Sequence, residues 1–111
     1  MEVKDIVEKM ELEVFSGAGN LDKEVKGGYA SDLLSDVLGF ADEGYMWITL
    51  QTHKNVVAVA SLKKLSAIVL VKGNRPESGM LAQAQAEGIP VLGTAEPAFE
   101  TIGRIYALLN A

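Results

Sequence analysis

The stretch from residue 45 to residue 71 decides the fold class of this chain. It reads YMWITL at positions 45–50, NVVAVASLKKL at positions 55–65 and AIVLV at positions 67–71. A continuous apolar run of four to eight residues is typical of a strand that is buried on both faces, and the longer middle segment has the length of a helix. The order of strand, helix and strand predicts parallel strands that are joined by a helical crossover.

The same alternation continues toward the C-terminus. Apolar spacing and turn residues predict a helix over 78–87 that Gly88 ends, a short strand over 90–92 and a last helix over 97–109. We therefore predict an α/β fold of three layers, a mostly parallel sheet with helices on both faces. No linker or repeat divides the chain, so residues 1–111 are predicted to form a single domain.

The first 43 residues have a less regular pattern. Val3, Ile6, Val7 and Met10 recur at helical spacing, and glycines and an asparagine mark a later turn. Five elements are expected in this region. They are a helix over 3–10, a brief strand over 12–15, a turn over 16–20, a loop over 26–30, and a helix that begins after an N-cap at Ser31 and ends at Gly39.

Composition excludes several classes of function. The chain has no cysteine, so disulfides, a cysteine nucleophile, a cysteine-ligated zinc site and a thiolate-held iron–sulfur cluster are excluded. A net charge of −5 argues against a sequence-independent nucleic-acid binder. No apolar stretch approaches the ~20 residues of a membrane span, and the N-terminus does not resemble a secretory signal. We therefore expect a cytoplasmic protein without a membrane or nucleic-acid partner.

The charge is unevenly distributed along the chain. Residues 1–43 carry 11 acids and 4 bases, whereas residues 44–111 carry 4 acids and 6 bases. The basic part coincides with the regular strand–helix units. This division predicts complementary faces between the two parts, within one subunit or across a dimer.

Polar residues gather in three segments, each of which follows a predicted strand. The carboxyl ends of parallel strands meet at one edge of a sheet, and the helix N-termini that follow favour an anion. We predict a site there for a small anionic ligand or a nucleotide. Its residues are Thr52, His53, Lys54 and Asn55 from the first loop, Gly73, Asn74 and Arg75 from the second, and Thr94 from the third. The alternative is that these loops are simply polar, with Thr94 and Asn55 as helix N-caps, because no Walker loop or dinucleotide fingerprint is present.

Two further patterns leave other functions open. Asp32 and Asp36 lie four residues apart on one predicted helix face, and with His53 they would form a two-carboxylate, one-imidazole metal site of an enzyme. Separately, residues 56–62 are apolar almost all round, so their helix must be covered by its own chain or by a second subunit. The second case predicts a homodimer, and a purely structural homo-oligomeric interaction subunit is a third hypothesis.

The motifs GYASDLLSDV at 28–37 and WITLQTH at 47–53 resemble those of DRTGG-domain proteins. The resemblance is greatest to the small stand-alone members that are associated with iron-only hydrogenase genes, and it extends over about residues 12–109. It implies a fold like the N-terminal domain of HPr kinase/phosphorylase. Related domains in phosphotransacetylases and pyrophosphatases act as regulatory or subunit-contact modules.

The resemblance also implies a function for the chain. It indicates a non-catalytic regulatory or ligand-sensing domain with no cofactor, which serves a hydrogenase or redox partner. Two departures from the family pattern bear on this. Lys72-Gly73-Asn74 stands where the family more often has Thr-Gly-Gly, which alters any anion-binding nest there, and the absence of cysteine means that this chain alone is not expected to hold an iron–sulfur cluster.

Overall fold

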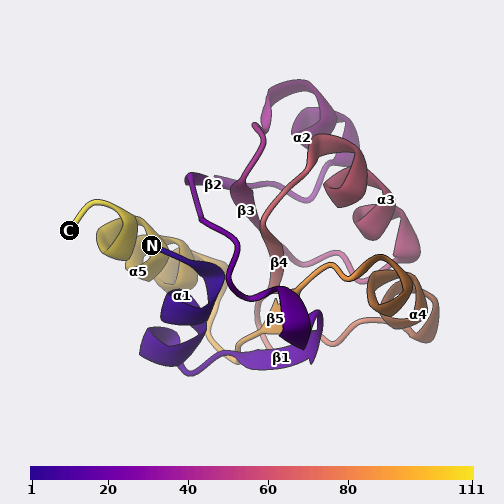
Figure 1. The fold of residues 1–111 in the computed structure, drawn as a ribbon. Coiled ribbons are helices and arrows are strands. Elements are labelled where there is room, and N and C mark those ends of the chain that lie inside the picture. The colour runs from indigo at the N-terminus through magenta and orange to yellow at the C-terminus, as the bar shows by residue number, and fades with distance from the viewer.

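A five-stranded sheet runs through the centre of the computed structural model, which describes all 111 residues (Figure 1). The strand order across the sheet is β1-β5-β4-β3-β2. Strand β1 pairs antiparallel with β5, and the other neighbours are parallel. The strands are β1 (Glu13–Ser16), β2 (Gly27–Ala30), β3 (Tyr45–Thr49), β4 (Ala67–Leu70) and β5 (Val91–Gly93).

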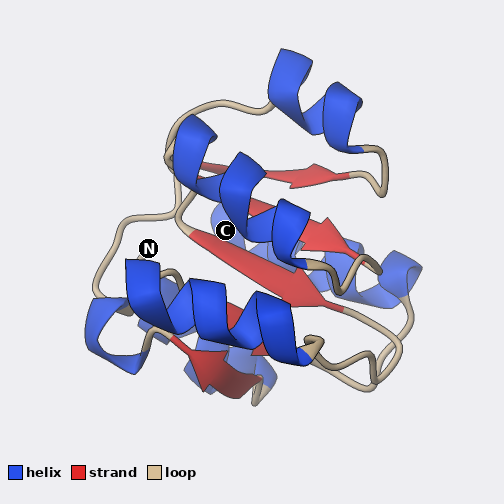
Figure 2. Ribbon diagram, turned by 90° about the vertical axis from the view of Figure 1, so that its right-hand side faces the viewer, coloured by secondary structure: helices blue, strands red, loops and turns tan.

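Helices cover both faces of this sheet. One face carries α2 (Leu34–Phe40), α3 (Lys54–Lys63) and α4 (Ser78–Glu87), and the other carries α1 (Val3–Met10) and α5 (Ala98–Leu109) (Figures 1 and 2). A short 3₁₀ turn over 18–20 follows β1. The predicted three-layer α/β fold is therefore confirmed. None of the helices has the length and apolar character that crossing a membrane requires.

Alternate residues of the central strands enter two separate hydrophobic cores. In β3, Trp47 packs into the core under α2, α3 and α4, while its neighbours Met46 and Ile48 pack into the core under α1 and α5. Strand β4 divides in the same way, with Ile68 on one side and Val69 on the other. Because side chains alternate across a strand, a strand buried on both faces needs an unbroken apolar run.

The apolar helix α3 is covered by its own chain. It lies between α2 and α4 on the sheet, and Val56 and Val57 are fully buried. Its exposed apolar positions are Ala58 and Leu62. Of the two predicted explanations for this helix the first holds, so α3 supplies no argument for a second subunit.

The loop predicted over 26–30 is wrong, because these residues form strand β2. Gly27 pairs with Tyr45 and Ala30 with Ile48 in parallel register. A Cβ atom at Gly27 would lie 2.7 Å from the Tyr45 ring, so this ring packs against the bare backbone of Gly27 and would have to move for any larger residue. Two adjacent glycines are a local turn signal, but pairing with β3 is a tertiary interaction and it decides the conformation.

The predicted boundaries of α2 are also wrong. Gly39 lies inside the helix, which ends at Phe40, and the helix begins only at Leu34. The Ser31 hydroxyl accepts a hydrogen bond from the Leu33 amide before the helix starts, so it is not the N-cap. Asp32 therefore precedes the helix and is not in its first turn. The other predicted elements begin and end within two residues of their observed limits, including the strand predicted over 90–92, observed over 91–93.

We predict that Gly17→Ala destabilises the fold by about 2 kcal/mol or more. Gly17 has a φ of +77°, which is costly for alanine, and an added Cβ would lie 2.5 Å from the Pro90 backbone. Urea denaturation monitored by circular dichroism measures the free energy of unfolding. Gly19→Ala is the matched control, since a Cβ there meets nothing within 4 Å. Equal denaturation midpoints for the two variants would contradict the prediction.

Candidate functional site

The carboxyl ends of β2, β3, β4 and β5 lie at one edge of the sheet, and the connections that leave two of them diverge. The chain that leaves β4 turns to α4 on one face, whereas the chain that leaves β5 turns to α5 on the other (Figure 1). Neighbouring parallel strands whose connections diverge leave a crevice between them. In α/β sheets such a crevice is the preferred position for a ligand.

A hollow of about 520 Å³ lies beside this crevice. The loops after β4 and β5 form one side of it, with Gly73, Asn74, Arg75 and Thr94 of the predicted site. The start of β1, the end of α1 and one residue of α5 form the other side. The lining residues of that second side that carry charge or an aromatic ring are Glu11, Glu13, Phe15 and Arg104, and Glu96 lines the hollow from the loop after β5.

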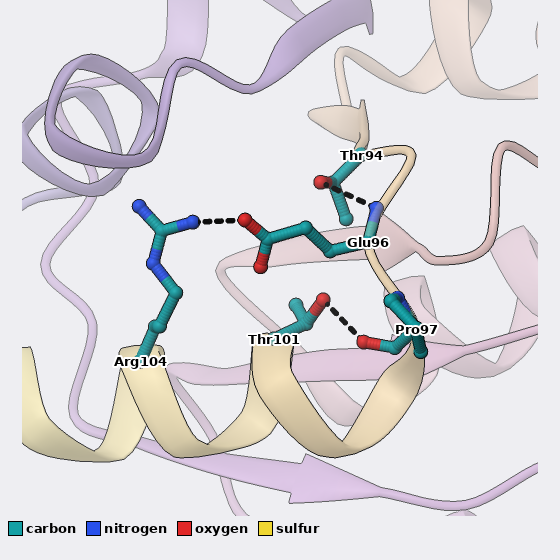
Figure 3. A network of polar contacts seen from close by, with 5 residues as sticks. All are labelled: Thr94, Glu96, Pro97, Thr101 and Arg104. Atoms are coloured by element: carbon teal, nitrogen blue, oxygen red, sulfur yellow. Dashed lines mark hydrogen bonds and ion pairs between the residues drawn. The ribbon is translucent and has the colours of Figure 1, made fainter.

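Two guanidinium groups face this hollow, and each is held by an exposed ion pair. Arg75 donates two hydrogen bonds to the Glu13 carboxylate, at 3.2 and 3.1 Å, and its guanidinium lies 4.8 Å from the centre of the Phe15 ring. Arg104 pairs with Glu96 (Figure 3). Exposed ion pairs contribute only ~0–1 kcal/mol, so a phosphate group that offers several oxygens can compete for both arginines. The Arg75–Glu13 pair also joins the acidic and basic parts of the sequence.

The loop before α5 is shaped by its own hydrogen bonds (Figure 3). The Thr94 hydroxyl accepts a hydrogen bond from the Glu96 amide at 3.2 Å, and the Thr101 hydroxyl donates to the Pro97 carbonyl at 2.8 Å. Thr94 is therefore not a helix N-cap, a position that Pro97 occupies. One carboxylate oxygen of Glu96 is paired with Arg104, while its buried Oε2 has no partner.

Backbone hydrogen bonds join the two loops across the crevice. The Lys72 amide donates to the Glu96 carbonyl at 2.8 Å, and the Gly73 amide donates to the Thr94 carbonyl at 2.9 Å. Gly73 has a φ of +71°. The amides of Arg75 and Ala95 make no hydrogen bond within the chain. The hollow thus has backbone donors beside its two cationic side chains.

The other four predicted site residues lie outside this hollow. The Thr52 hydroxyl donates to the Glu77 carboxylate at 3.1 Å, and the Glu77 amide donates to the Thr52 carbonyl at 3.0 Å. His53 is the N-cap of α3, because its Nδ1 accepts a hydrogen bond from the Asn55 amide at 3.2 Å. Lys54 begins that helix. The predicted set therefore divides in two, and the N-cap of α3 is His53 rather than Asn55.

A polar network after β2 was missed by the sequence analysis. The Asp32 carboxylate accepts hydrogen bonds from the Thr49 hydroxyl at 2.8 Å and from the Leu50 amide at 2.7 Å, and Gln51 donates to the Asp32 carbonyl at 3.1 Å. Asp32 thus fastens the loop after β2 to the loop after β3. Because residues 26–30 were read as a loop, no strand end was expected before Asp32.

The proposed metal site of Asp32, Asp36 and His53 is not formed. Asp36 accepts a hydrogen bond from the Tyr29 hydroxyl at 2.8 Å, and this bond raises the pKa of Tyr29 above its ordinary value. Asp32 and His53 are engaged in the loop contacts described above. No group of three or more histidine, cysteine, aspartate or glutamate side chains is placed to hold a metal ion. The hypothesis of a metal enzyme built on these three residues is therefore wrong.

The fold is similar to that of a regulatory region whose structure has been solved. The CBS and DRTGG domains of the regulatory region of a Clostridium perfringens pyrophosphatase, crystallised with the activator diadenosine tetraphosphate, match with a TM-score of 0.71 and 16% sequence identity. The match covers 90% of this chain and 44% of that chain. This likeness shows a DRTGG-like fold. No protein-family model and no curated protein sequence matches the chain.

We predict that Asp32→Ala lowers the free energy of unfolding by about 1 kcal/mol. The substitution removes the acceptor of two charge-assisted hydrogen bonds, a loss that partial exposure of Asp32 reduces. Asp22→Ala is the control, because Asp22 is exposed and makes no side-chain hydrogen bond. Thermal unfolding of both variants measures the difference. An unchanged melting temperature for Asp32→Ala would show that the network does not stabilise the fold.

Proposed function

We propose that this chain is a non-catalytic regulatory domain that senses a small anionic ligand. The ligand binds in the hollow at the carboxyl ends of β4 and β5. One observation carries the proposal: Arg75 and Arg104 face a hollow beside the diverging connections, and each is held only by an exposed ion pair. An entering phosphate or carboxylate displaces Glu13 or Glu96 and accepts hydrogen bonds from the guanidinium groups that these glutamates held. The amides of Arg75 and Ala95 supply further donors.

A nucleotide is the ligand class that these contacts favour. The guanidinium carbon of Arg75 lies over the Phe15 ring, 4.8 Å from its centre, and a nucleobase stacks well on either an aromatic ring or a guanidinium plane. The pyrophosphatase regulatory region of similar fold was crystallised with a dinucleoside polyphosphate activator. A hollow that offers an aromatic ring beside its phosphate donors suits a phosphate that carries a base better than it suits inorganic phosphate.

Other elements of the prediction rest on the sequence. The homodimer, the hydrogenase or redox partner and the cytoplasmic location stay predictions, and the partner depends on the resemblance of residues 28–37 and 47–53 to DRTGG-domain proteins. A purely structural interaction subunit is the competing function. It differs in having no ligand, so a binding measurement separates the two.

We predict that diadenosine tetraphosphate or ATP raises the melting temperature of the chain. A ligand at about 100 times its Kd stabilises the folded state by ~2.7 kcal/mol, which corresponds to roughly 10 °C for a domain of this size. A thermal-shift titration with these two nucleotides, AMP and inorganic phosphate measures the effect. No shift with any of them would overturn the proposal in favour of the structural subunit.

Arg75→Ala and Arg104→Ala are each predicted to weaken nucleotide binding at least tenfold. Each removes one charge-assisted contact to phosphate. Isothermal titration calorimetry measures the Kd, and Lys63→Ala is the control that changes the same unit of charge at the end of α3 away from the hollow. Equal affinities for all three variants would place the ligand elsewhere on the chain.

A further inference from the structure

Helix α5 presents an apolar face to solvent. Phe99 and Tyr106 are 85% and 69% exposed, and Ile102 between them is 36% exposed. The three recur at positions i, i+3 and i+7 and so lie on one side of the helix. The opposite side of α5 packs into the core through Thr101 and Ile105. A large aromatic residue left this exposed at helical spacing marks an interaction surface rather than scattered surface apolarity.

The same helix carries a depression beside its protruding side chains. A shallow hollow of about 580 Å³ lies along α5, and Phe99, Gly103 and Ala107 line it together with the charged side chains of Glu96, Glu100 and Arg104. A Cβ at Gly103 would meet nothing within 4 Å, so this part of the helix surface is open. We name Phe99, Ile102, Gly103, Tyr106 and Ala107 the α5 face. The Phe99 side chain projects from this face, and the recess beside it can accept a side chain of the same kind.

We infer that two copies of this chain associate through the α5 face, with the two helices antiparallel about a two-fold axis near Gly103. A two-fold interface must be self-complementary, because the same patch serves both subunits. Phe99 and Ala107 are equally far from Gly103 along the chain. Antiparallel packing therefore places the Phe99 ring of each copy over the Ala107 recess of the other. Small residues at a helix crossing allow the close approach that this packing needs.

The charges beside the α5 face fit the same arrangement. Glu100 is exposed and makes no ion pair within its chain, and Arg104 lies one turn farther along the helix. Their opposite charges flank the centre of the helix. Antiparallel packing therefore brings the acid of one copy toward the base of the other, twice by symmetry. Parallel packing would instead set like charges side by side.

A lipid surface is a poorer occupant for the α5 face. A helix that lies on a membrane carries lysine and arginine along its polar side, whereas Arg104 is the one basic residue of α5. The chain as a whole carries a net charge of −5, which anionic lipid repels. A second copy of the chain instead offers an identical apolar surface that is complementary to the first.

The area available is compatible with a weak to moderate dimer. Burial of four aromatic side chains, two from each copy, removes roughly 150 Å² apiece from water, about 600 Å² in all. Ile102, Gly103 and Ala107 of both copies add to this area. The total stays below the ~1,200 Å² at which standard interfaces begin, so a weak dimer with a Kd in the micromolar range is expected. This inference does not rest on the proposed ligand, although Arg104 lines both the hollow and the recess on α5.

Analytical ultracentrifugation between about 5 and 200 µM tests the association. The unaltered chain is expected to shift from monomer to dimer over this range, and Phe99→Asp is expected to weaken dimerisation at least tenfold. Leu62→Asp is the matched control, because Leu62 is 72% exposed on α3, on the opposite face of the sheet, and should leave the dimer intact. A monomer at 200 µM, or equal weakening by both substitutions, would overturn the inference.

The absence of cysteine allows a second test that reports the geometry. Gly103→Cys introduces a single thiol into the chain, at a position with open space and close to the inferred two-fold axis. Mild oxidation is expected to give a disulfide-linked dimer in high yield, since the two Cα atoms must approach within about 7 Å. Gly39→Cys, an equally open helical position in α2, is the control. Equal cross-linking of both variants would show that the disulfides form by random collision. The α5 face would then not be the surface through which the two copies associate.

Discussion

The burial of β3 and β4 on both faces is the constraint on which the rest of the structure depends. Side chains alternate across a strand, so each of these strands supplies alternate residues to two cores. Neither core can form without a helical layer above it. That requirement explains why three helices cover one face, why α1 and α5 cover the other, and why α3 can be apolar almost all round without a second subunit. It also leaves the edges of the sheet, rather than its faces, for any contact with a ligand.

The passage of the chain from one layer to the other creates the candidate site. Helix α4 returns over the first face and α5 crosses to the second, so the chain leaves β4 and β5 toward opposite faces, while backbone hydrogen bonds join the two loops next to the strand ends. Arg104 and Glu96 line both the hollow at this edge and the shallow recess on α5. A ligand that takes Arg104 from Glu96 therefore changes the charge beside the α5 face. The ion pair of Figure 3 therefore belongs to both surfaces.

Some residues that line the hollow could be predicted from the sequence, and others could not. Gly73, Asn74, Arg75 and Thr94 were found from sequence because they follow strands that are evident as apolar runs. Glu13, Phe15 and Arg104 were not, because they reach the hollow from β1 and α5, far away in the sequence. Thr52 and His53 lie at the same edge of the sheet but do not line the hollow. The contacts of Thr52 with Glu77 and the capping of α3 by His53 hold them apart from the hollow.

The sequence by itself determined the fold class, because periodicity and apolar runs are local properties. They can be recognised without knowing which segments lie side by side in the fold. It also determined most helix limits, since residues such as Gly88 end a helix through their own backbone preferences. Only the tertiary structure decided that Gly27–Ala30 is a strand, that Asp32 fastens two loops, and that Arg75 and Arg104 share one hollow. Each of these depends on which segment lies beside which. That choice is made by the packing of whole layers, and no short window of sequence records it.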